Sequence, residues 1–154
     1  MLNGYNILKY VHVLSVVIWI GGITGLAVAT WRVAKERNRA FLAALVKQSV
    51  TYGQWVVGPA AGLVLLTGLA MVGMGHIGFG TFWVWFGYAG VLVHAILGGF
   101  ILRKRAEAVL RLASGGAGDD VAMVAAARRL WNTQLVYLVL LAIVIAGMVI
   151  KPVP

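Results

Sequence analysis

The sequence predicts an all-α integral membrane protein: a four-helix up-down bundle in a single transmembrane domain, residues 1–154. Hydrophobic residues make up 62% of the 154-residue chain and only 11% of its residues are charged, against roughly a quarter in soluble domains. The mean hydropathy is +0.94. Four apolar runs are each long enough to cross a hydrocarbon core of about 30 Å. Because backbone groups in that core must be hydrogen-bonded within their own segment, each run is expected to be a helix.

The four spans are expected at about residues 6–30, 52–74, 81–103 and 130–150. The second span contains Pro59 within WVVGPAAG, which predicts a kink because proline lacks the N–H of a regular helix. The segment before it is expected to be mostly helical from about Ala40. Between the third and fourth spans, the stretch SGGAGDD should end a helical extension of the third span, and Asp119 or Asp120 can cap the start of the fourth.

The basic residues predict how the spans are oriented. Of the 13 basic residues, all but Lys9 and Lys151 lie between the first and second or between the third and fourth spans. The positive-inside rule therefore places these two segments in the cytoplasm and both termini outside. The net charge of +9 is then explained by topology, and no nucleic-acid partner is expected. The basic residues of these two segments are Arg32, Lys35, Arg37, Arg39 and Lys47, and Arg103, Lys104, Arg105, Arg111, Arg128 and Arg129.

Several kinds of chemistry are excluded by composition. The chain has no cysteine, which excludes disulfides, iron–sulfur clusters and cysteine-bound zinc. Its four acidic residues all lie in the cytoplasmic segments: Glu36, Glu107, Asp119 and Asp120. Paired carboxylates inside the membrane are therefore absent, and hydrolytic chemistry there is not expected.

Two histidines inside the predicted spans are the main functional candidates, because ionisable groups are costly within a bilayer. His12 lies in the first span, and Trp19 falls on the same helix face. His94 lies in the third span, on a face that also carries three glycines. Such a glycine-lined groove either lets another backbone approach closely or leaves room for a flat macrocycle. The three glycines are Gly87, Gly90 and Gly98.

Both histidines are candidate ligands of a haem iron, since neutral imidazole is the commonest metal ligand. The first and third helices of an up-down bundle run in parallel, and His12 and His94 differ in depth by about 6 Å, or four residues. The alternative is that each imidazole forms a hydrogen bond to a neighbouring helix. Lys9, one turn before His12, either extends to the lipid headgroups or holds an anionic group such as a propionate.

A second candidate site is formed by methionines near the outer surface. Met71, Met74 and His76 leave the second span together, and Met148 ends the fourth span at a similar depth. Thioether and imidazole ligands suit copper(I). The alternative is that the methionines fill gaps between helices.

Four segments carry a family resemblance when taken in order. They are KYVHVLSVVIWIGG (9–22), GPAAGLVLLTGL (58–69), VLVHAILGGFILRK (91–104) and LWNTQLVYLVLLAIVIAGMVIKP (130–152). This set resembles the HemJ-type protoporphyrinogen IX oxidases and the related CopD-like and DUF2269 small membrane proteins. The HemJ branch carries a lysine early in its third span, where this chain has FWVWFGY, and a glutamate at the position of Thr133. The resemblance is therefore to the wider group.

The resemblance implies a four-helix protein of the bacterial cytoplasmic membrane that binds haem b, with His12 and His94 as the haem-associated histidines and Lys9 beside them. In the HemJ branch it implies oxidation of protoporphyrinogen IX. The first hypothesis is thus a haem b-binding redox protein, with oxidation of protoporphyrinogen or a quinol as its candidate reaction. The alternatives are a cofactor-free accessory subunit of a respiratory-type membrane complex and a copper-handling protein. Expected partners are the lipid bilayer and either further copies of the chain or a larger membrane complex.

Overall fold

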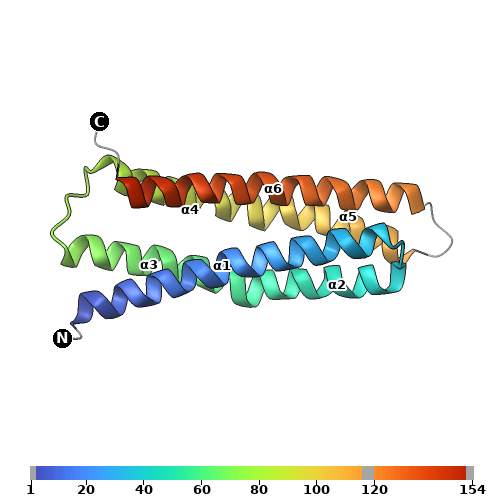
Figure 1. Ribbon diagram of the computed structural model, residues 1–154, viewed down its shortest axis with the longest axis horizontal. Helices are drawn as coiled ribbons and strands as arrows, with labels where there is room; N and C mark the ends of the chain where they lie inside the picture. The colour runs from blue at the N-terminus through green and yellow to red at the C-terminus, as the bar shows by residue number, and fades with distance from the viewer. Residues whose placement is uncertain (1–2, 116–119, 152–154) are drawn as a thin grey trace.

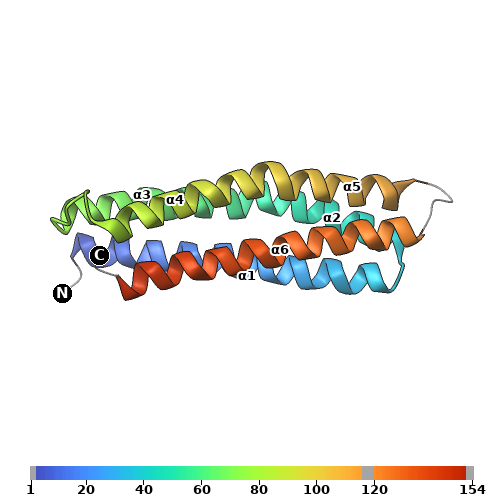
Figure 2. The same cartoon turned by 90° about the horizontal axis from the view of Figure 1, so that it is seen from above.

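The computed structural model describes residues 3–115 and 120–151, and these residues form four long helical rods (Figures 1 and 2). The first rod is α1 (Gly4–Lys35) and the fourth is α6 (Asp120–Ile150). The second rod joins α2 (Arg39–Tyr52), the π-helical segment η1 (Gly53–Val57) and α3 (Gly58–Met74). The third joins α4 (Phe82–Ile96), the π-helical segment η2 (Leu97–Leu102) and α5 (Arg103–Ser114). The predicted all-α four-helix membrane bundle is confirmed.

The two ends of the bundle differ in character. The described chain ends and the α3–α4 connection lie at one end, which we call the terminal end (Figure 1). The α1–α2 connection and the far ends of α5 and α6 lie at the other, which we call the basic end because the basic segments are there. Assignment of the basic end to the cytoplasm stays a prediction of the positive-inside rule.

All four rods are long and apolar enough to cross a membrane, with lengths of 31 to 36 residues. At 1.5 Å per residue they extend roughly 46–54 Å, well beyond a hydrocarbon core of about 30 Å. The excess lies at the basic end, where the helices enclose an apolar core of their own. Its buried residues are Val33, Ala34, Leu42, Val46, Ala106, Val109, Ala113, Met123, Ala127 and Leu130.

The segments that connect the spans are helical, as predicted. α2 begins at Arg39, and the Asn38 side chain caps it by accepting a hydrogen bond from the Phe41 N–H at 3.1 Å. α5 ends at Ser114 before Gly115, whose N–H donates to the Arg111 carbonyl. Asp120 is the first residue of α6, whereas Asp119, the other candidate cap, lies outside the described residues.

One ion pair joins three helices at the basic end. The Arg39 guanidinium contacts Asp120 Oδ1 at 2.6 Å and donates to the Leu112 carbonyl at 3.1 Å. Arg39 thereby ties the start of α2 to the start of α6 and to the last turn of α5.

The two π-helical segments are features that the hydropathy pattern does not predict. η1 ends two residues before Pro59, and the Gly58 N–H closes it by donating to the Gly53 carbonyl. An extra residue in the turn before a proline accommodates the missing N–H and the bulk of the ring. The second span thus contains a π-helical turn next to the position where the kink is predicted. η2 interrupts the third rod at Leu97–Leu102.

Helix packing leaves space between the second and third rods. α1 packs closely along α3, α4 along α6, and α2 along α5, whereas α3 and α4 touch only briefly. Within the part of the chain that is described, no Cα atom of η1 lies within 8 Å of one of η2. The interior between these rods is therefore hollow in places, and both candidate histidines lie beside it.

Candidate functional site

Two cavities lie along the bundle. The terminal-end cavity has a volume of about 470 Å³ and is lined by residues that include Lys9 and His12. The basic-end cavity has a volume of about 540 Å³ and is lined by residues that include His94 and Arg103. Three side chains line both cavities and thus form the layer between them: Trp19, Leu65 and Val91.

The His12 ring is held by a hydrogen bond to α3. Its Nδ1 lies 3.0 Å from Thr67 Oγ1, and the Thr67 hydroxyl lies 2.5 Å from the Leu63 carbonyl oxygen, to which it donates. Because the single hydroxyl hydrogen is used there, we assign the hydrogen between the two side chains to His12 Nδ1. Nε2 then carries a lone pair and makes no hydrogen bond among residues 3–115 and 120–151, while the Val64 backbone carbonyl also interacts with the ring. The His12 imidazole is therefore oriented but retains one open ligand position.

Polar groups surround the rest of the terminal-end cavity. Lys9 and Lys151 both line it, and Lys151 Nζ lies 5.0 Å from the centre of the Trp83 ring. The Tyr88 hydroxyl is buried and has no hydrogen-bond partner in the described structure. An otherwise apolar cavity thus carries two cations, an unpaired hydroxyl and an imidazole nitrogen.

His94 lies in a different environment. It is only 1% exposed, and both ring nitrogens face backbone carbonyl oxygens: Nδ1 at 2.6 Å from Gly90 and Nε2 at 3.1 Å from Tyr137. The Trp19 and Tyr137 rings meet the imidazole edge to face, with ring centroids at 5.9 and 4.6 Å. In this structure His94 joins α4 to α6, which is the hydrogen-bonding alternative considered above, and neither nitrogen is open to a ligand.

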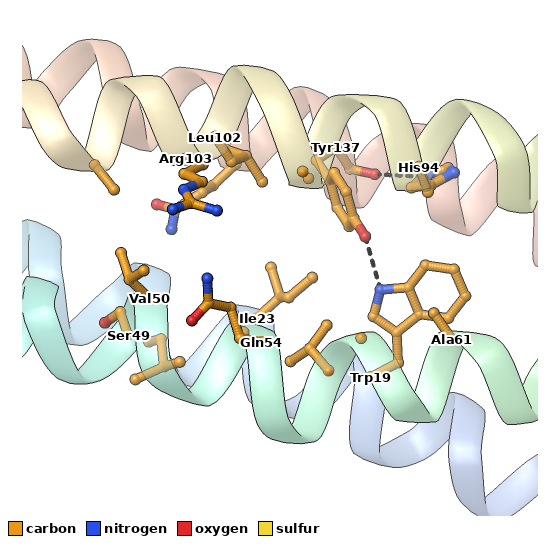
Figure 3. A pocket seen from close by; sticks show the side chains of 18 of the residues that line it. Trp19, Ile23, Ser49, Val50, Gln54, Ala61, His94, Leu102, Arg103 and Tyr137 are labelled. Carbon is orange, nitrogen blue, oxygen red and sulfur yellow. Dashed lines mark hydrogen bonds between the residues drawn. The ribbon is translucent and has the colours of Figure 1, made fainter.

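Trp19 belongs to the same buried cluster. It is 2% exposed, and its Nε1–H donates to the Tyr137 hydroxyl at 2.7 Å (Figure 3). Tyr137 also provides the carbonyl that faces His94. Trp19, Tyr137 and His94 therefore link α1, α6 and α4 at the layer that separates the two cavities.

The glycine face of the third span is largely covered by α6. A Cβ atom at Gly87 would lie 2.5 Å from Met148 Sδ, and one at Gly90 would lie 2.5 Å from a γ-carbon of Val144. A Cβ at Gly98 would meet the Tyr137 ring at 3.7 Å. At Gly87 and Gly90 the structure thus shows the close approach of another helix, as in the first of the two alternatives for this face.

The four candidate copper ligands are divided between two places. Met71 and Met148 line the terminal-end cavity, whereas Met74 and His76 do not. Met74 is about half exposed, and His76 is exposed just after the end of α3. No three His, Asp or Glu side chains come together to hold a metal in residues 3–115 and 120–151.

Three polar residues of the basic-end cavity were not singled out as site candidates from the sequence. Gln54, Arg103 and Gln134 line it, and the buried Gln134 Oε1 has no hydrogen-bond partner in the described part of the chain. The available signal is helical spacing, since Gln134 precedes Tyr137 by one turn and so shares its inward face.

Comparison with known proteins identifies the family. No curated protein and no solved structure matches the chain. A family model described as "Predicted integral membrane protein (DUF2269)" matches residues 6–152, nearly the whole bundle. With four membrane-length helices and this match, the chain belongs to the DUF2269 family of integral membrane proteins.

Proposed function

We propose that this protein binds one haem b in the terminal-end cavity, with His12 as an iron ligand, and acts as a redox protein of the bacterial cytoplasmic membrane. The volume of about 470 Å³ falls within the range of cofactor and ligand sites, roughly 300–1,000 Å³. Such sites are mostly apolar with a few polar groups, as this cavity is. The residues present therefore fit an amphipathic macrocycle.

The observation that carries the proposal is the state of the His12 ring. Thr67 Oγ1 accepts a hydrogen bond from His12 Nδ1 at 3.0 Å, and Nε2 makes no hydrogen bond to the described residues. Metal-binding histidines commonly donate one N–H to a neighbouring oxygen, which fixes the tautomer and the ring orientation for the other nitrogen. Thr67 is the positioning residue for His12 in this proposal.

The charges at the cavity suit the acidic edge of haem b. Lys9 and Lys151 would hold the two propionate carboxylates, whose charges need partners at the edge of an apolar site. Tyr88 offers an unpaired hydroxyl as a further hydrogen-bond partner. When bound, haem iron supplies one-electron transfer chemistry. The family resemblance suggests protoporphyrinogen as the electron donor, and a quinol is the alternative in the first hypothesis.

His94 has no ligand role in this proposal. Its two nitrogens face the Gly90 and Tyr137 carbonyls, and it lines the cavity on the other side of Trp19. Ligation by one histidine replaces the two-histidine arrangement expected from the sequence.

The test is a reduced-minus-oxidised spectrum of the purified, haem-supplemented protein. The wild type should show haem bands, His12→Ala should lose them, and added imidazole should restore them by filling the vacated position. His94→Gln, which keeps a polar side chain, should retain the bands. Elution volume and helical circular dichroism check the fold of each variant.

Two outcomes would overturn the proposal. A colourless wild type after haem supplementation would favour the cofactor-free accessory subunit. Bands that survive His12→Ala but vanish in a folded His94→Gln would assign the iron to the other histidine.

A further inference from the structure

We infer that the basic-end cavity is a second binding site, which takes the neutral head group of a lipid-soluble hydroquinone that enters from the bilayer. The site is separate from the proposed haem cavity, because Trp19, Leu65 and Val91 lie between the two. Four features carry the inference: where the cavity opens, what its walls lack, which polar atoms it presents, and which head group can satisfy them.

The cavity opens between the second and third rods. Its exposed lining residues all belong to these two rods, whereas every lining residue from α1 and α6 is buried or half-buried. Figure 3 shows the cavity between the two rods, with α1 and α6 behind it. The opening lies at η1 and η2, beside the apolar spans, so a ligand reaches it sideways from the lipid. The exposed lining residues are Gln54, Gly58, Gly62, Ala95, Gly99 and Arg103.

The walls of this opening lack side chains where helices usually carry them. A Cβ atom added at Gly53, Gly62 or Gly99 would meet no atom within 4 Å. These glycines therefore do not serve close helix packing, in contrast to Gly87 and Gly90. Their effect is to keep the space between η1 and η2 open, and π-helical turns are themselves frequent at functional sites.

The polar atoms of the cavity are an unfilled acceptor and several donors. Gln134 Oε1 is buried without a hydrogen-bond partner in the described structure. Arg103 Nε pairs with Glu107 at 3.1 Å, which partly offsets its charge and leaves the terminal guanidinium N–H groups available to the cavity. Gln54 adds an exposed amide on the opposite wall, facing Arg103 across the opening (Figure 3).

This set of atoms distinguishes between possible head groups. A buried acceptor such as Gln134 Oε1 requires a ligand hydrogen, and a carboxylate or phosphate diester has none to give. A hydroquinone hydroxyl can donate to Gln134 and accept from Arg103 or Gln54. Its ring and tail would contact the apolar part of the cavity, which includes Ile23 and Val91. The oxidised quinone lacks the O–H, so it should bind about tenfold more weakly, the effect of one buried acceptor left unpaired.

The experiment is photolabelling of the full-length protein in lipid nanodiscs with a diazirine-bearing ubiquinol analogue, followed by peptide mapping. Label is expected within residues 49–62 and 95–106. Decylubiquinol should compete at concentrations about tenfold below those of decylubiquinone, and oleate should compete poorly.

Three variants sharpen the test. Gly99→Phe should abolish labelling because the ring fills the opening, whereas Gly21→Phe, at an equally open glycine outside both cavities, should leave it unchanged. Gln134→Leu should remove the preference for the reduced form. His12→Ala should label like the wild type, so that loss of haem binding and loss of quinol binding are separate results.

Labelling outside the two expected segments would overturn the inference. So would labelling that persists in Gly99→Phe, or a Gln134→Leu protein that still prefers the quinol. Oleate that competes as well as decylubiquinol would identify a lipid-tail site instead.

Discussion

Replacing Gly90 by alanine adds a methyl group at the closest approach of α4 and α6. The new Cβ would lie 2.5 and 2.7 Å from the two γ-carbons of Val144 and 3.2 Å from its Cβ. Carbon atoms in contact prefer about 3.5–4.0 Å, so the helices would have to separate locally by about 1 Å. Val144 cannot turn aside easily, because a β-branched side chain in a helix has one strongly preferred rotamer. We expect Gly90→Ala to lower the free energy of unfolding by about 2 kcal/mol, within the range for overpacked cores.

A matched control and a rescue variant separate this clash from helix propensity. At Gly25 an added Cβ would meet nothing within 4 Å, so Gly25→Ala should be neutral or stabilise the protein by up to about 1 kcal/mol. Val144→Ala removes both γ-carbons and should cost about 1–2 kcal/mol alone. The double variant Gly90→Ala/Val144→Ala should lose less unfolding free energy than the two single variants together. The difference, which is the coupling energy between the two positions, should be about 1 kcal/mol or more.

The assay is reversible unfolding by steric trapping in bicelles, which reports the free energy of unfolding in a bilayer-like medium. A Gly90→Ala protein as stable as Gly25→Ala would refute the reasoning. Strict additivity of Gly90→Ala and Val144→Ala would refute it as well, since the clash is between those two positions.

Three further predictions concern the hydrogen bonds of the bundle. Trp19→Phe leaves the Tyr137 hydroxyl unpaired and should cost about 1 kcal/mol of unfolding free energy. Adding Tyr137→Phe should recover part of that loss. Losses that simply add in the same assay would contradict this prediction. Thr67→Val removes the acceptor of His12 Nδ1 and should weaken haem binding about tenfold in a spectral titration, whereas Thr67→Ser should bind like the wild type. Arg39→Ala should destabilise the basic end by about 1 kcal/mol, and a loss that does not shrink at high salt would argue against an ionic cause.

Much of the fold could be predicted because the bilayer restricts the choices. Apolar runs that span it must be helical, and the basic residues then order the connecting segments. The helical start near Ala40 followed from the same pattern. The π-helical segments could not be predicted, since a change from i→i+4 to i→i+5 hydrogen bonds leaves hydropathy unchanged. Pro59 indicated that the second span is distorted, but it did not indicate that the distortion is a π-helical turn.

The candidate site was less predictable, because its chemistry depends on which atoms meet. His12 and His94 look alike in the sequence, each a lone imidazole in an apolar helix. Their hydrogen bonding differs, because Thr67 contacts only Nδ1 of His12, whereas both nitrogens of His94 face backbone carbonyls. Gln134, near the start of a span, resembles an ordinary interfacial residue until the cavity beside it is seen.

The layer of Trp19, Leu65 and Val91 has an electrical consequence. Both cavities are lined mainly by apolar side chains, so the layer between them belongs to the low-dielectric barrier across which a membrane potential falls. A charge that crossed this layer would therefore traverse part of that potential. The full potential corresponds to about 2.3 kcal/mol per charge at 100 mV. Any charge transfer between the two cavities should accordingly depend on the membrane voltage. The Trp19 indole is part of the apolar layer that such a charge would have to cross.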